Sequence, residues 1–240
     1  MIISQSNKFI FFKPMKCAGT SVEYSLSIKY PFVGNDICTG QLGYHNNYGD
    51  WSYNLKKYPF LEDGRGEHWN PSTLSSYWPA LGLGDKLNQY NIITITRDPL
   101  EQLVSYYWWA HASKNQLAFS METCPKTGDY PKDVILKFHK WLDVPYSASI
   151  FKEPKPPVER PHQTLSRIND EMVGVAGLVL NQASLADDCK KYFDISFPIP
   201  RFKSGKKHMK NPASEYFRDI PQAKKLILDS FPHTMNFLST

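Results

Sequence analysis

A lysine precedes a run of small and hydroxyl-bearing residues near the start of the chain. The run consists of Lys16, Cys17, Ala18, Gly19, Thr20 and Ser21. Small residues let the backbone approach a ligand closely, and the start of a helix presents N–H groups to an anion. Lys16 adds a full positive charge at the same place. These residues predict a loop that binds phosphate or sulfate, and an ordinary strand-to-helix turn is the alternative interpretation.

The order of residues in this loop excludes one common phosphate-binding motif. A Walker A loop has a glycine and a lysine directly before its Ser or Thr. Here Gly19 stands before Thr20, and Lys16 lies on the other side of the small residues. The sequence therefore argues against a generic nucleoside triphosphatase.

Arg97 and Ser105 form a second candidate anion site. Arg97 follows the β-branched stretch 91–96, which predicts a strand, and Asp98 after it predicts a helix cap. Open α/β sheets bind ligands at the carboxyl ends of their strands. An arginine there grips a phosphate through two parallel hydrogen bonds, and a serine hydroxyl adds another. The alternative interpretation pairs Arg97 with Asp98 or Glu101.

The elements that must position these residues alternate between strands and helices. Strands are expected at 9–12, 91–96 and 172–180, and helices follow each of them, with further helices at 131–142 and 223–238. Thr20 or Ser21 is expected to cap the first helix, and Asn70 or Ser72 the helix after His68. This alternation predicts an α/β fold with a central sheet flanked by helices, in a single domain over 1–240.

Two stretches have weaker patterns. The segment 31–66 is rich in Gly, Asn, Tyr and Asp, with little periodicity, and is expected to be a long loop at an acceptor cleft. The run 200–210 is basic with a central glycine, which suits either a solvated face or a cover over an anionic ligand.

Composition limits the class of protein. The 240 residues carry a net charge of +5 with a pI near 8.8, which suits an anionic ligand without requiring nucleic acid. Neither a long apolar segment nor a secretory signal is evident, so a soluble cytoplasmic protein without a membrane partner is expected. The four cysteines are widely spaced with no CxxC pair, which predicts reduced thiols and no metal site.

Taken together, the motifs resemble those of sulfotransferases that use 3′-phosphoadenosine 5′-phosphosulfate (PAPS). The likeness is to the carbohydrate group that includes heparan sulfate 2-O-sulfotransferase. The run 16–21 is similar to the 5′-phosphosulfate loop, commonly written PKxxGTS, although Met15 stands where the family has proline. The segment 95–107 is similar to the 3′-phosphate motif, an arginine followed eight residues later by a serine. Residues 204–208 are similar to the late loop that covers the nucleotide.

The resemblance implies a P-loop-like parallel sheet and a role for each motif. Lys16 would stabilise the leaving phosphate, and the amides of the loop, with the Thr20 and Ser21 hydroxyls, would hold the 5′-phosphate. Arg97 and Ser105 would bind the 3′-phosphate, and the product would be 3′-phosphoadenosine 5′-phosphate.

The remaining implied roles concern the cover and the base. Gly205, Lys206 and Lys207 would close over the nucleotide. His68 lies where the 2-O group carries its catalytic base, and Glu67 is the second candidate for that role. No metal would be required, because lysine and arginine supply the positive charge.

Two alternatives stay open at this point. An ATP-dependent kinase or other phosphotransferase would use a similar loop together with Mg²⁺ ligands, and a non-catalytic nucleotide- or glycan-binding protein would keep the pocket without the chemistry. The acceptor is expected to be a hydroxyl on a glycan or a small molecule, and the sequence does not indicate an oligomeric state.

Overall fold

The computed structural model describes residues 1–39, 54–58, 60–61, 68–84, 86–112, 134–143, 146–147, 158–200 and 212–240. The chain divides into two compact units, and each draws on two stretches of sequence. The first unit comprises Met1–Thr96 and Glu171–Phe202, and the second comprises Arg97–Asp170 and Lys203–Thr240. A single domain over the whole chain therefore remains a prediction.

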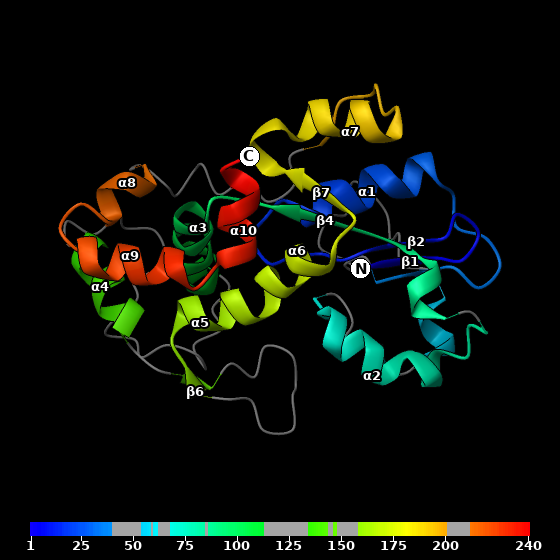
Figure 1. Cartoon of the computed structure of the whole chain (residues 1–240), viewed down its shortest axis with the longest axis horizontal. Helices are drawn as coiled ribbons and strands as arrows, with labels where there is room; N and C mark the ends of the chain where they lie inside the picture. Colours follow the sequence, from blue (N-terminus) through cyan, green and yellow to red (C-terminus); the bar gives the residue numbers. More distant parts are fainter. Residues whose placement is uncertain are drawn as a thin grey trace. The chain divides into compact units, whose positions relative to one another are not determined.

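The first unit holds the main sheet and the helices that flank it (Figure 1). Its elements, with η for short 3₁₀ turns, are β1 (Ile2–Ser4), β2 (Phe9–Phe11), α1 (Gly19–Lys29), β3 (Ile37–Cys38), η1 (Leu55–Lys57), α2 (Pro71–Leu81), η3 (Leu87–Gln89), β4 (Asn91–Thr96), α6 (Glu171–Val175), β7 (Leu178–Asn181), η6 (Gln182–Ser184) and α7 (Leu185–Phe193).

The main sheet has five strands in the order β3-β1-β2-β4-β7. β2, β4 and β7 run parallel, as the sequence predicts, while β1 pairs antiparallel with both β2 and β3. The fold is therefore α/β with a mixed sheet, and the expectation of a purely parallel sheet is wrong at this edge. Only the four residues Gln5 to Lys8 join β1 to β2, and a connection that short permits only an antiparallel pair.

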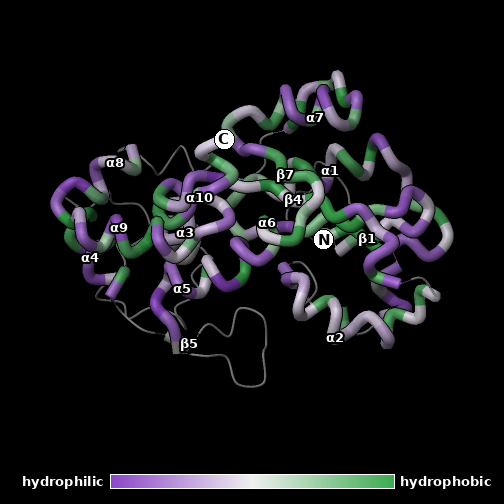
Figure 2. Tube along the Cα trace, in the orientation of Figure 1, coloured by the Kyte–Doolittle hydropathy of each residue, from purple (hydrophilic) through white to green (hydrophobic). Residues whose placement is uncertain are grey.

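The buried face of the sheet explains why these segments form strands. Phe11 of β2, Ile93 and Ile95 of β4 and Leu180 of β7 pack against Val22 and other buried residues of α1 and α7. β4 and β7 are mostly hydrophobic in Figure 2, as expected for central parallel strands. This packing fixes α1, and with it the loop that precedes α1, against the middle of the sheet.

The stretch 172–180 shows where periodicity misleads. It is not one strand: Glu171–Val175 forms α6, and β7 begins only at Leu178. A short apolar run fits a buried helix as well as a buried strand, and Ala176 and Gly177 separate the two elements here. Within the segment 31–66, Ile37–Cys38 is a strand rather than a loop, because it pairs with β1.

The described residues of the second unit are mainly helical and include a two-stranded ribbon. Its elements are α3 (Pro99–Ala112), α4 (Val134–Asp143), β5 (Tyr146–Ser147), β6 (Val158–Glu159), α5 (Pro161–Leu165), the π-helical turn η5 (Ser166–Asp170), α8 (Ala213–Tyr216), α9 (Pro221–Asp229) and α10 (Pro232–Leu238).

An aromatic core holds the second unit together. Its rings are fully buried and come from three helices: Tyr107 from α3, Phe138 and Trp141 from α4, and Tyr216 from α8. Phe138 meets Tyr107 and Tyr216 edge to face, and Tyr107 and Trp141 are tilted against each other. The indole Nε1 of Trp108 donates to the Tyr216 hydroxyl at 3.1 Å, so that buried polar pair is satisfied. The residues expected to form one C-terminal helix form two, since Pro232 begins a new helix.

Cys17, Cys38 and Cys189 are buried thiols, and burial raises the pKa of the Cys189 thiol to about 11, which makes it unreactive at neutral pH. Among the helices in the described part of the chain, none is long and apolar enough to cross a membrane.

Candidate anion-binding site

The predicted anion loop lies between β2 and α1, at the carboxyl end of a parallel strand. Ala18 is the N-cap of α1, and Ser21 and Val22 both donate their backbone N–H to its carbonyl. The expectation that Thr20 or Ser21 caps the helix is therefore wrong, since both lie inside its first turn. Within the described residues no side chain caps α1, so the helix starts on backbone alone.

The backbone of this loop has an unusual conformation. Lys16 and Ala18 have φ values of 64° and 65°, in the left-handed region that L-residues seldom adopt, and Cys17 between them is not left-handed. Such a conformation is held only where the surroundings enforce it, and it is found preferentially at functional sites. Successive backbone N–H groups in turns with left-handed residues can point toward one place and bind an anion. This geometry favours the anion loop over an ordinary turn.

A buried ion pair ties the loop to α1. The Nζ of Lys13 lies 2.9 Å from Oε2 of Glu23, and the two side chains are 2% and 0% exposed. The second oxygen of Glu23 accepts from the amino group of Met1 at 2.7 Å. Because buried charges must be paired, this cluster holds the start of the loop in one place.

Gly19 is required because the Lys13 side chain passes directly over it. A Cβ built at Gly19 would lie 2.6 Å from Cγ of Lys13, and Lys13 cannot move aside while its ammonium pairs with Glu23. We expect Gly19→Ala to destabilise the protein by about 1–3 kcal/mol, the usual cost of overpacking. Urea unfolding of the variant measures this loss.

Gly177→Ala is the matched control for this substitution. A Cβ at Gly177 would meet only the Ile92 carbonyl oxygen, at 3.9 Å, which is ordinary van der Waals contact. Its stability should match that of the wild type. Equal losses in the two variants would show that Lys13 does not constrain the loop as described.

His68 lies beside this loop. Its Nδ1 is 2.7 Å from the backbone carbonyl oxygen of Lys13, and the imidazole must donate because a carbonyl only accepts. In the neutral ring the lone pair then lies on Nε2, the atom that accepts a proton in general base catalysis. The structure thus places His68 beside the loop, although Lys16 and His68 are 52 residues apart in sequence.

The segment after His68 is anchored at the start of α2. Asn70 is the N-cap, accepting from the Thr73 N–H at 2.9 Å, so the predicted cap is confirmed. Glu171 of α6 accepts from the Asn70 side chain and from the backbone N–H and hydroxyl of Ser72. These bonds hold the chain on the carboxyl side of His68 and limit how far its ring can shift.

Arg97 and Ser105 belong to the second unit. Asp98 accepts from the N–H groups of Leu100 and Glu101, which confirms it as the cap of α3. Nε and Nη2 of Arg97 both lie 3.1 Å from Oε2 of Glu101, as the alternative interpretation of Arg97 expects. The Glu101 side chain is 50% exposed, and such pairs contribute little to stability.

Four of the candidate residues lie outside the described part of the chain. They are Glu67, Gly205, Lys206 and Lys207. Residues 40–53, 59 and 62–66 of the expected acceptor loop lie outside it as well. The roles that the resemblance implies for them stay predictions.

Sequence reasoning missed Lys13. It assigned the chemistry to Lys16 and treated Lys13 only as the end of the apolar strand. The available signal was its position: a lysine directly after four apolar residues, at the end of a central strand, is expected to be buried and to need a counter-charge. Glu23, one turn into the following helix, supplies it.

Comparison of the chain with protein families, with curated proteins and with solved structures gave no match. The functional assignment therefore depends on the residues of the site and on their geometry.

Proposed function

We propose that this protein is a sulfotransferase that moves a sulfuryl group from PAPS to a hydroxyl, on a carbohydrate acceptor. One observation carries the proposal: a left-handed loop with Lys16 at the start of α1, with His68 hydrogen-bonded to the backbone of that loop. The loop offers an anion cradle and His68 offers a base, and sulfuryl transfer needs both.

The loop would hold the 5′ end of the donor. Amides at the start of α1, with no side-chain cap among the described residues, suit a phosphate at the helix N-terminus. Thr20 is half-buried in the first turn and would add its hydroxyl, whereas Ser21 is buried and its backbone N–H already donates to the Ala18 carbonyl. Lys16 would donate to the oxygen that bridges phosphorus and sulfur.

The chemistry is an in-line displacement. The acceptor oxygen forms a bond to sulfur while the bond from sulfur to the bridging oxygen breaks, and the electron pair stays on the phosphate. Lys16 neutralises the charge that develops on that oxygen. Nε2 of His68 takes the proton from the acceptor hydroxyl, since Nδ1 donates to Lys13. Positioning and charge stabilisation supply most of the rate, as in phosphoryl transfer.

The test is transfer of labelled sulfate from PAPS to a panel of glycans and small alcohols by the full chain. We expect labelled product with a glycan hydroxyl. Tight binding of 3′-phosphoadenosine 5′-phosphate without transfer to any acceptor would make the protein a binder rather than an enzyme. Binding of each nucleotide is measured by calorimetry. Tighter binding of ATP with Mg²⁺ than of 3′-phosphoadenosine 5′-phosphate would make the protein a phosphotransferase.

Arg97 is assigned to the 3′-phosphate, the group that separates PAPS from ordinary adenylates. Its pair with the half-exposed Glu101 is weak enough for a phosphate to replace. We expect Arg97→Ala to weaken binding of 3′-phosphoadenosine 5′-phosphate by about 1.5–3 kcal/mol, the range for a lost charged hydrogen bond. Calorimetry of variant and wild type measures the difference.

The control ligand is adenosine 5′-phosphate, which lacks the 3′-phosphate. Its affinity should be the same in both proteins, and Arg218→Ala, at another exposed pair of the second unit, should change neither ligand. Equal affinity of wild type and Arg97→Ala for the 3′-phosphorylated ligand would leave Arg97 as a structural partner of Glu101.

A further inference from the structure

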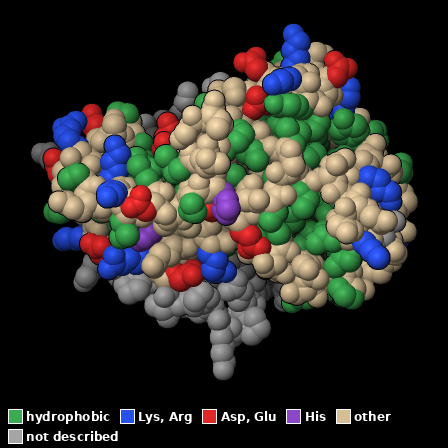
Figure 3. Space-filling model, viewed as in Figure 1, with side chains coloured by type: hydrophobic (Ala, Val, Ile, Leu, Met, Phe, Trp, Pro, Cys, Tyr) green, Lys and Arg blue, Asp and Glu red, His purple; other side chains and the backbone are tan. Residues whose placement is uncertain are grey.

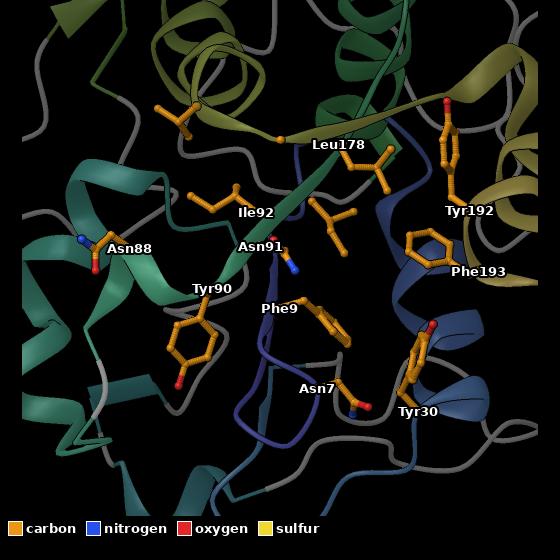
Figure 4. A pocket seen from close by; sticks show the side chains of 13 residues that line it. Asn7, Phe9, Tyr30, Asn88, Tyr90, Asn91, Ile92, Leu178, Tyr192 and Phe193 are labelled. Carbon is orange, nitrogen blue, oxygen red and sulfur yellow. The ribbon is translucent and has the colours of Figure 1, made fainter.

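A hollow lies in the first unit, at the amino-terminal ends of the parallel strands (Figure 4). The loop with Lys16 follows the carboxyl end of β2, so the hollow and the loop lie at opposite ends of the same strands. Its volume is about 670 Å³, within the range of small-molecule sites. It is thus separate from the site proposed for the sulfuryl donor.

Two helices end beside this hollow. α1 ends at Lys29 and α7 at Phe193, and Tyr30 and Tyr192 at these ends line the hollow. Phe9, the first residue of β2, is buried against the same two helices. Gly177, just before β7, has no side chain to fill the space.

Aromatic rings form the walls. Five aromatic residues line the hollow. They are Phe9 in β2, Tyr30 at the end of α1, Tyr90 directly before β4, and Tyr192 and Phe193 at the end of α7. Tyr192 is 45% exposed, as is Val175, another lining residue. Hydrophobic side chains gather on the surface below α7 in Figure 3. Phe9, Tyr90 and Phe193 are only 5%, 6% and 7% exposed and form buried walls, whereas Tyr192 leaves apolar surface open to water at the rim. Exposed apolar surface beside a concave site is typical of a surface that binds a ligand.

Carboxamides supply the polar groups. Asn7, Asn88 and Asn91 line the hollow, and Asn91 is the first residue of β4, on the same face as the buried Ile93 and Ile95. Asn91 is exposed there, at a strand position where asparagine is otherwise unfavourable. None of the thirteen described lining residues carries a charge. Each carboxamide both donates and accepts hydrogen bonds, as vicinal hydroxyl groups require.

This combination discriminates between ligand classes. The ammonium groups of Lys8 and Lys191 lie over the rings of Tyr90 and Tyr192, at 5.4 and 4.7 Å, so an anion would have to draw them away from those rings. The Asn7 amide already donates to Ser4 and Ser6, but an acyl chain would take water from Asn88 and Asn91 without replacing its hydrogen bonds. A sugar ring has apolar C–H faces that stack on aromatic rings and hydroxyl groups at its edge that pair with amides. We propose that this hollow binds a neutral sugar unit of an oligosaccharide.

The test uses the full chain and saturation-transfer NMR with cellobiose, maltose, lactose and N,N′-diacetylchitobiose, without any sulfuryl donor. We expect at least one disaccharide to bind, and Tyr192→Ala and Asn91→Leu each to weaken it by roughly tenfold, as loss of a central contact does. Both positions are exposed, so urea midpoints should stay at the wild-type value. Tyr77→Ala is the matched control, because Tyr77 is 43% exposed but does not line the hollow.

Three outcomes would overturn this site: no disaccharide binds, the Tyr77 variant weakens binding as much as the Tyr192 variant, or adenosine displaces the sugar. The last would identify a nucleobase site. Because binding is measured without transfer, a protein with no sulfotransferase activity would still give a clear answer here.

Discussion

Replacing Lys16 by alanine is expected to lower the rate of sulfuryl transfer by on the order of a hundredfold or more, the effect of removing one preorganised electrostatic contact. Lys16 lies in the left-handed turn of the loop, and the proposed mechanism assigns its ammonium group to the leaving oxygen. Initial rates with labelled PAPS measure the loss, and a urea midpoint equal to that of the wild type shows that the fold is intact.

The left-handed backbone at Lys16 allows a sharper control. Alanine keeps the strain at φ 64°, whereas glycine relieves it, so Lys16→Gly removes the charge and makes the loop conformation easier. Both variants should lose transfer equally if the charge is what matters. Lys56→Ala, at an exposed lysine of the same unit, should leave the rate unchanged. Near-normal turnover in Lys16→Ala would remove this residue from the mechanism.

The features that the sequence predicts well are local. The strand at 91–96 and the cap at Asp98 are confirmed at those residues, because a β-branched run and an Asp-Pro pair decide their own conformation. The Asn70 cap follows from the same short-range chemistry. The turn before α1 also follows from small residues placed after a strand, and its anion-binding role stays a prediction.

The features that the sequence does not predict depend on distant residues. β3 becomes a strand only because β1 lies beside it, and nothing in Ile37 and Cys38 themselves indicates this. The hydrogen bond from His68 to the Lys13 carbonyl joins residues 55 apart in sequence. The hollow depends on where α1 and α7 end, and element ends are what periodicity predicts least well.

The buried pair of Lys13 and Glu23 leads to the largest expected change in stability. Glu23→Gln keeps the shape of the side chain but removes the buried carboxylate that pairs with both the Lys13 ammonium and the Met1 amino group. Breaking a buried ion pair in this way costs about 3–5 kcal/mol. Urea unfolding, followed by tryptophan fluorescence and by far-UV circular dichroism, gives the free energy of unfolding.

Lys13→Met separates loss of the charge pair from loss of packing. In this variant Glu23 keeps its contact with the amino group of Met1, and an apolar side chain replaces Lys13 in an apolar site. Removing one partner of a buried pair is costly when it leaves the other charge uncompensated, and here the Met1 amino group still pairs with Glu23. We therefore expect Lys13→Met to be much more stable than Glu23→Gln. Arg218→Ala removes an exposed pair and should change the free energy of unfolding little.

The same pair of variants links stability to the site. The backbone carbonyl of Lys13 survives in Lys13→Met, so His68 keeps its hydrogen bond and the orientation of its ring. Transfer by Lys13→Met should then stay near the wild-type rate. In Glu23→Gln, loss of the Glu23 charge should shift the loop, and the rate should fall with it. Equal stability of the two variants, or full activity of Glu23→Gln, would show that the ion pair does not hold the loop in its catalytic conformation.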